Sequence, residues 1–200
     1  MKNLKHKTSK DLHYVELELD GLFIEEKPTS NPFAIDINIV PFFSPPSKGQ
    51  QLKEWIDYID NLAKDNNVDG MIIKLGNIQA GMGKKREMHN ALLRFKNSNK
   101  KIIVYSENYI SGSDYYLTSM ANEIYTHRMS GIDLKGLNME MTFIRGLLDT
   151  LSIVPEVIRV SPYKTAGDMF VNRNMSDEMR ENYSELIDDL YNIYVNDISN

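Results

Sequence analysis

The chain has 200 residues, of which 42% are hydrophobic and 26% are charged, so it can bury the core of one ordinary domain and is not disordered throughout. Its net charge of −5 argues against a nucleic-acid partner, because nucleic-acid binders normally present a basic face. The absence of cysteine excludes disulfides and thiol nucleophiles, and the 4 scattered histidines lack metal-ligand spacing, so we expect neither a metal nor a cofactor.

The N-terminal part divides into an arm, a strand and a connection. Residues 1–13 form a polar, basic arm, and no apolar signal-peptide core follows it. Strict alternation of apolar and acidic residues predicts a half-buried strand over residues 14–20. Prolines crowd residues 27–51, which predicts a long irregular connection. Its phenylalanines indicate packing, either on its own domain or on another subunit.

Strands and helices alternate through the remaining chain. The patterns predict strands at residues 70–75, 102–105, 123–126 and 155–160. They predict helices at residues 52–64, 86–95, 139–151 and from 176 onward, with Ser176 as the cap of the last one, and a further helix that Ser113 or Asp114 caps and that ends at Met120. A glycine-rich loop is expected at residues 76–83. This alternation predicts one α/β domain over residues 14–200, with a largely parallel sheet flanked by helices and a site at the carboxyl ends of the strands.

Lys164 is the candidate functional residue, because it comes just past the end of the predicted strand at 155–160, after the break at Ser161-Pro162. Pro162 ends that strand, since proline has no N–H for a sheet ladder. Ala166 and Gly167 are small and let other backbone approach closely. Such a lysine can supply a catalytic amine. The alternative is a solvated surface charge, which is the usual role of lysine.

Four stretches resemble the signal peptide peptidase A family, also called protease IV. They are VDGMIIKLGNIQAG (68–81), SENYISGSDYYLTSMANEIY (106–125), GLNMEMTFIRGLLDTLSIVPEVIRVSPYKTAGDMF (136–170) and NMSDEMRENYSELIDDL (174–190). The resemblance covers residues 14–200 and is to the N-terminal half of the long, tandem form of the family. It implies the Clp-protease/crotonase-like layered fold and a serine endopeptidase with a Ser–Lys dyad, which degrades signal peptides or other membrane-released peptides.

By this resemblance Lys164 is the general base, which must be neutral near pH 7 to accept a proton from serine. Gly112 takes the position of the nucleophile, and Ser111 and Ser113 on either side are out of register by one residue. The serine is therefore expected from a C-terminal half of the same protein, and the chain alone is expected to be inactive. The loop at residues 76–83 lacks the family's S-P-G-G motif, so we expect it to be structural.

The resemblance also implies partners and a location. We expect peptide substrates, the C-terminal half and further copies of the chain as partners, and no nucleic acid. Full-length relatives are membrane-associated or periplasmic, but no apolar run here approaches the roughly 18 residues of a membrane span, so an anchor is expected outside this chain. The alternatives are a non-catalytic scaffold of the same fold that serves oligomerisation, and a crotonase-type acyl-CoA enzyme, for which paired carboxylates at the required turns are missing.

Overall fold

The structure is a computed structural model that describes residues 12–26 and 49–199. The predicted polar arm as far as residue 11, and residues 27–48 of the proline-rich connection with their phenylalanines, lie outside the described residues. The chain divides into two compact units, Met1–Leu134 (unit 1) and Lys135–Asn200 (unit 2), which are described separately below.

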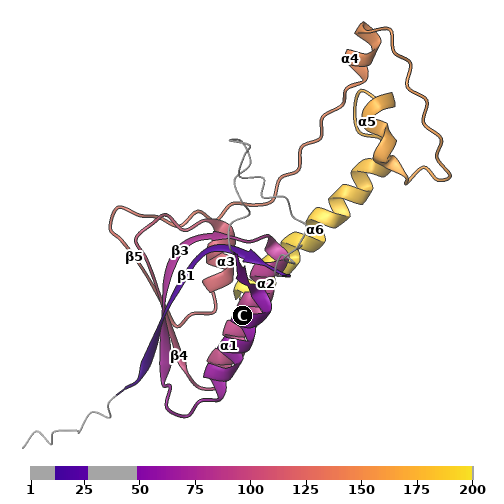
Figure 1. The fold of residues 1–200 in the computed structure, drawn as a ribbon. Helices are drawn as coiled ribbons and strands as arrows, with labels where there is room; N and C mark the ends of the chain where they lie inside the picture. Colours follow the sequence, from indigo (N-terminus) through magenta and orange to yellow (C-terminus); the bar gives the residue numbers. More distant parts are fainter. Residues whose placement is uncertain (1–11, 27–48, 200) are drawn as a thin grey trace, which may run out of the picture. The chain divides into compact units, whose positions relative to one another are not determined.

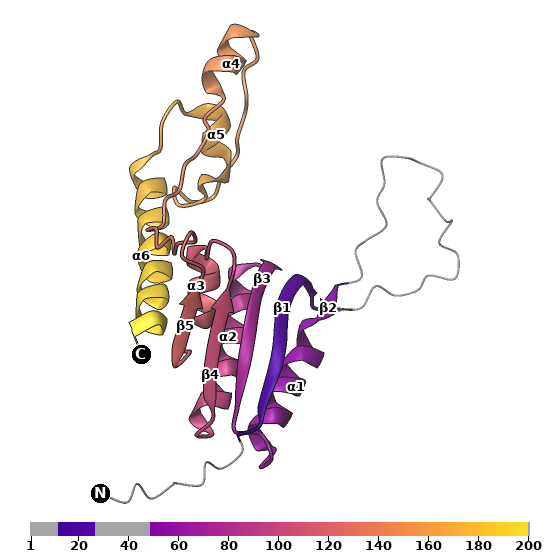
Figure 2. The same ribbon diagram turned by 90° about the vertical axis from the view of Figure 1, so that its left-hand side faces the viewer.

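Unit 1 is built on a parallel sheet with the strand order β2-β1-β3-β4-β5 (Figures 1 and 2). Every neighbouring pair of strands is parallel. The strands are β1 (Tyr14–Ile24), β2 (Gln50–Gln51), β3 (Gly70–Gln79), β4 (Lys101–Ser106) and β5 (Glu123–Thr126). The predicted parallel α/β architecture is confirmed, and β5 has the predicted bounds.

Helices α1 (Leu52–Lys64), α2 (Met82–Asn97) and α3 (Gly112–Thr118) lie together on one face of this sheet, as Figure 1 shows. Trp55 of α1 is fully buried and meets Phe23 of β1 edge to face, with ring centroids 6.2 Å apart. The inward side chains of α2 complete the core: Met88, Ala91, Leu92 and Phe95 are all fully buried. In β4 the side chains alternate between buried and half-buried, which is the period of a strand with one face on the core.

The predicted glycine-rich loop at residues 76–83 is wrong, because β3 continues to Gln79 and α2 begins at Met82. Ile78 is buried and pairs with Gly21 of β1, so this part of the chain belongs to the sheet. Gly76 has a steric role there: a Cβ at this position would collide with the Asp20 carboxylate. Asp20 Oδ1 in turn accepts a hydrogen bond from the Asn77 N–H at 2.6 Å. The glycine therefore makes room for a cross-strand contact.

This contact predicts opposite effects for two glycine substitutions. Gly76→Ala would displace Asp20 and break its bond to Asn77, and we expect it to lower the free energy of unfolding by about 1–3 kcal/mol. Gly83→Ala is the control, because Gly83 lies in α2 with open space around its Cβ position, and we expect it to stabilise the chain by about 0.5–1 kcal/mol. Urea unfolding of both variants measures the difference. A neutral Gly76→Ala would contradict the steric role.

Unit 2 contains short helices and one long one. These are α4 (Arg145–Thr150), a 3₁₀ turn (Thr165–Gly167), α5 (Asp168–Val171) and α6 (Asp177–Ser199). The helix predicted over residues 139–151 is confirmed only for α4, and residues 139–144 are not helical. None of the helices in the described residues is both long and apolar enough to cross a membrane.

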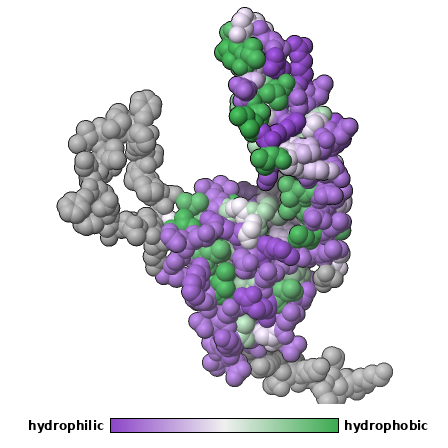
Figure 3. Space-filling view, turned by 90° about the vertical axis from the view of Figure 1, so that its right-hand side faces the viewer, coloured by the Kyte–Doolittle hydropathy of each residue, from purple (hydrophilic) through white to green (hydrophobic). Residues whose placement is uncertain are grey.

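The strand predicted at residues 155–160 is wrong, since these residues form no strand in the described part of the chain. Ile158 and Val160 are 91% and 95% exposed, and no described strand pairs with them. A β-strand needs a neighbouring strand for its backbone hydrogen bonds. An apolar pattern that suits a strand therefore stays irregular where no neighbouring strand is present. Other apolar side chains of unit 2 are exposed as well, and Figure 3 shows hydrophobic groups in green on the face that it presents.

Candidate functional site

The turn between β4 and α3 is where the family resemblance places the missing nucleophile. Ser111 has an extended backbone conformation, and its Oγ accepts a hydrogen bond from the Asp114 N–H at 3.3 Å, so Ser111 is the N-cap of α3. The prediction that Ser113 or Asp114 caps this helix is therefore wrong. Both residues already lie inside the helix, whose first residue is Gly112. Gly112, the position to which the resemblance assigns the nucleophile, has no side chain and is the first residue of α3.

A partly buried polar cluster lies at this turn. Lys85 reaches it from α2, with a side chain that is 5% exposed. Its ammonium donates to Ser113 Oγ and to Asp114 Oδ1, each at 2.7 Å. Ser111 Oγ donates to Asp114 Oδ2 at 2.7 Å. We call these four residues, Lys85, Ser111, Ser113 and Asp114, the α3 cluster.

The α3 cluster places an amine beside a serine hydroxyl, which is superficially the geometry of a Ser–Lys dyad. However, the Lys85 ammonium already donates both to Ser113 Oγ and to the Asp114 carboxylate, with which it forms an ion pair at 2.7 Å. A charged ammonium has three donors and no acceptor, so it cannot take the proton of Ser113. The cluster therefore fixes the start of α3 and does not activate a nucleophile.

Lys164, the predicted catalytic residue, belongs to unit 2 and directly precedes the 3₁₀ turn. Its N–H donates to the Ser161 carbonyl at 3.0 Å, which closes a turn after the residues that do not form the predicted strand. Its side chain is exposed, and no carboxylate of the described residues is within ion-pairing distance of its amine. Lys164 therefore lies on a turn of its own, and the expectation that it extends from the end of a sheet strand is wrong.

Asp168, four residues after Lys164, is the buried carboxylate of unit 2. Its side chain is 1% exposed, and Arg159 Nη1 donates to its Oδ1 at 2.7 Å. Ser176 Oγ donates to its Oδ2 at 2.8 Å. Ser176 also accepts from the Met179 N–H at 3.3 Å, which confirms it as the cap of α6. We call Arg159, Asp168 and Ser176 the Asp168 clamp, since they join the segment before Lys164, the first residue of α5 and the cap of α6.

The small residue predicted to leave room near Lys164 has a different neighbour. A Cβ on Gly167 would lie 2.5 Å from Val157 Cγ1, so Gly167 allows the segment that contains Val157 to approach the 3₁₀ turn. On the other side of the lysine, the Tyr163 hydroxyl donates to Glu181 Oε2 of α6 at 2.8 Å. This hydrogen bond raises the pKa of Tyr163 above its ordinary value, with further contributions from the negative charges of Glu181 and its neighbours. The residues on either side of Lys164 are therefore fixed, by the packing of Val157 on Gly167 and by the hydrogen bond from Tyr163 to Glu181.

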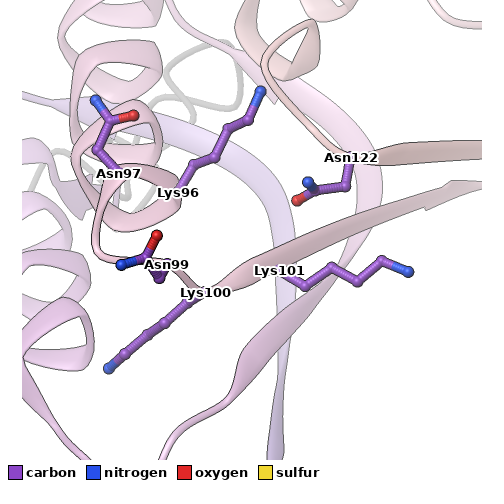
Figure 4. Close-up of a pocket in the computed structure, with 6 residues that line it drawn as sticks. All are labelled: Lys96, Asn97, Asn99, Lys100, Lys101 and Asn122. Atoms are coloured by element: carbon purple, nitrogen blue, oxygen red, sulfur yellow. The ribbon is translucent and has the colours of Figure 1, made fainter.

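A shallow hollow of about 500 Å³ lies at the amino-terminal end of β4 (Figure 4). Six polar residues line it: Lys96, Asn97, Asn99, Lys100, Lys101 and Asn122. The three ammonium groups point in different directions in Figure 4. Lys100 donates to two carbonyls of the α1 end, and Lys101 pairs with Glu123, which raises the pKa of Lys101 and lowers that of Glu123. The hollow has no convergent set of groups for a ligand.

Comparison with known proteins identifies the class. The sequence model of peptidase family S49 matches residues 94–200. The chain is 31% identical over 142 residues to Protease 4 of Haemophilus influenzae, which covers 70% of this chain and 23% of that protein. It is 29% identical over 185 residues to Protease 4 of Salmonella typhi, covering 92% and 30%, and 29% identical over 154 residues to the chloroplastic serine protease SPPA of Arabidopsis thaliana, covering 76% and 22%.

The sheet with its helices therefore has the layered fold of the Clp-protease/crotonase type, as predicted. The chain belongs to peptidase family S49, and the resemblance to signal peptide peptidase A is confirmed. These relatives are named as proteases, and the one from Arabidopsis thaliana is named as a serine protease. The chain spans less than a third of the length of each of these relatives.

Proposed function

We propose that this chain supplies Lys164 as the general base of a Ser–Lys dyad endopeptidase, and that the serine comes from a second half of the protein. The proposed substrates are signal peptides or other membrane-released peptides. The observation that carries this proposal is that the Lys164 amine forms no ion pair with a described carboxylate. Asp168 is only four residues away, but Arg159 and Ser176 bind it. A base lysine needs this, because a paired carboxylate would keep the amine charged.

The chemistry requires Lys164 to lose solvent on assembly. A lysine amine titrates near pH ~10.4 in water, and burial among apolar groups favours its neutral form. Lys164 is exposed in this chain, so the apolar surroundings must come from a partner. The exposed apolar side chains of unit 2, among them Val154, Ile158 and Val160, supply one wall for such an assembly. We propose that the partners are the serine-bearing half and further copies of this chain.

In the assembled site, the neutral Lys164 amine would accept the proton of the serine hydroxyl while the serine oxygen attacks the peptide carbonyl carbon. The resulting ammonium would then donate this proton to the leaving amine as the peptide C–N bond breaks, and an acyl-enzyme would remain. Water would then attack the acyl carbonyl carbon. The neutral Lys164 amine would accept a proton from this water and return it to the serine oxygen as the acyl group leaves. Gly112 fits this division of labour, since it leaves the nucleophile position of this chain without a side chain.

The second candidate is a scaffold of the same fold without catalytic residues. It is favoured by Gly112 and by the α3 cluster, in which the hydroxyls of Ser111 and Ser113 are both engaged in structural hydrogen bonds. In this case unit 2 would serve assembly only, and Lys164 would be an ordinary surface charge. The two candidates differ in what happens when a serine-bearing half is added.

Labelling with a fluorophosphonate probe separates the candidates. We expect no labelling of this chain alone, because neither Ser111 nor Ser113 has a base to activate it. Co-expression with the serine-bearing half should give a complex in sedimentation and stoichiometric labelling on that half. Ser111→Ala and Ser113→Ala variants serve as controls. Labelling of Ser111 or Ser113 would overturn the assignment, and an unlabelled complex would favour the scaffold.

A further inference from the structure

We propose that Arg159 is a positioning residue that holds the buried Asp168 carboxylate and thereby keeps it from pairing with the Lys164 amine. This inference deepens the proposed function and rests on it for its purpose, since only a base needs protection from a carboxylate. Its structural content is a competition between two cations for one buried anion.

The sequence spacing creates this competition. Lys164 and Asp168 are four residues apart, at the start of the 3₁₀ turn and at the first residue of α5. Lys164 itself has a non-helical backbone just before the 3₁₀ turn, so only this turn separates it from Asp168, and a long lysine side chain can span that stretch to meet a carboxylate. In the structure this pair is absent among the described contacts, and Asp168 is instead paired with Arg159.

The burial of Asp168 makes the competition strong. A carboxylate that is 1% exposed needs a cation and hydrogen-bond donors, because an unpaired buried charge is costly. Arg159 supplies the charge on Oδ1, and Ser176 supplies the donor on Oδ2. Arginine suits this task because its guanidinium does not lose its proton near neutral pH and is less strongly hydrated than an ammonium.

The other carboxylates of this unit are of three kinds: some have partners, some lie on α6, and Glu156 is exposed beside Val157, the residue that packs against Gly167 of the 3₁₀ turn. Asp149 of α4 is bound by Arg145 and Arg173, and these two arginines lower its pKa. Glu181 is bound by Tyr163, with Glu178 and Glu185 nearby on the same helix. Lys164 is therefore the cation nearest to Asp168 in the chain that has no described ion pair. If Arg159 loses its charge, Asp168 should capture Lys164.

The test measures the reactivity of the Lys164 amine in the intact chain, and it needs no protease activity. The chain is treated with trace acetic anhydride over a range of pH, and acetylation of each lysine is quantified by mass spectrometry. In Arg159→Met we expect the midpoint of Lys164 acetylation to rise by about one pH unit, because pairing with a carboxylate protects the ammonium. The double variant Arg159→Met with Asp168→Asn should restore the original midpoint.

Two controls keep the outcome specific. Lys64, an exposed lysine at the end of α1 in unit 1, should keep its acetylation midpoint in every variant. Arg159→Lys retains a cation on Asp168 and should leave Lys164 nearly unchanged. If Arg159→Met fails to fold, Ser176→Ala provides the second test, since it frees Asp168 Oδ2 and should shift Lys164 in the same direction by less.

An unchanged Lys164 midpoint in a folded Arg159→Met chain would overturn the proposal, as would a shift that persists in the double variant. This result is distinguishable from failure of the proposed function. If Lys164 is not the general base, Lys164 variants of the assembled enzyme would keep full peptide cleavage, whatever the acetylation midpoints show. Conversely, the clamp could fail in this assay while Lys164 remains essential for cleavage.

Discussion

Replacing Lys164 with alanine is expected to lower peptide cleavage by the assembled protease by about 10²–10⁴-fold, the usual contribution of a general base. Folding should not change, because the Lys164 side chain is exposed and makes no described contact, and such substitutions cost no more than about 0.5 kcal/mol. Lys164→Arg should be equally inactive, since a guanidinium cannot give up its proton near neutral pH. The measurement is kcat/KM on a signal-peptide substrate after co-expression with the serine-bearing half.

Lys64→Ala is the matched control, an exposed lysine far along the chain that should leave cleavage unchanged. Circular dichroism and sedimentation of each complex show whether folding and assembly are preserved. An active Lys164→Arg enzyme would refute the base assignment outright. The surface-lysine alternative predicts that both Lys164 variants keep full activity.

The second large effect is expected at Lys85. Lys85→Ala should lower the free energy of unfolding of unit 1 by about 3–5 kcal/mol, because it leaves the Asp114 carboxylate in the α3 cluster without its cation. A large part of that loss should be recovered in the double variant Lys85→Met with Asp114→Asn, since removing both charges of a buried pair is much less costly than removing one.

Chemical denaturation of the chain measures both Lys85 variants against Lys64→Ala, for which we expect a change within about 0.5 kcal/mol. A mild effect of Lys85→Ala would show that the α3 cluster is dispensable. Substitutions in the α3 cluster would then leave the start of α3 intact.

The fold of unit 1 could be read from the sequence because each element there has a local signature. The stripe of Trp55, Ile56 and Ile59 predicts α1 with its observed bounds, and the alternation after Tyr14 predicts β1. The length of β3 could not be read in this way. Its glycine at position 76 signals a loop in isolation, and only the contact with Asp20 on the neighbouring strand explains it.

The predicted strand at residues 155–160 failed for a related reason. Its β-branched residues fit a strand, but a ladder needs a partner, and none is present among the described residues. The local sequence makes Lys164 a candidate but also fits a surface lysine, and only the family resemblance implies that it is a general base. The assignment stays a prediction.

The α3 cluster was missed although the sequence holds a signal for it. Lys85 sits in a run of basic residues that resembles a solvated face, yet it is three residues before Met88 and seven before Leu92. It therefore falls on the apolar stripe of α2, where a charge must find a buried partner. The partner, Asp114, is 29 residues away, and no local pattern could have named it.

The parallel pairing of β1 with β3 has a consequence for how the chain folds. His13 and Asp69, which are hydrogen-bonded at the start of this pair, are 56 residues apart. The strands of the described residues form no hairpin, so none of these pairs can form early through a tight turn, and each of their ladders must wait for a long connection to close. On the ribosome, the first strand to emerge can therefore complete its pairing only after both the second and the third strand have been made.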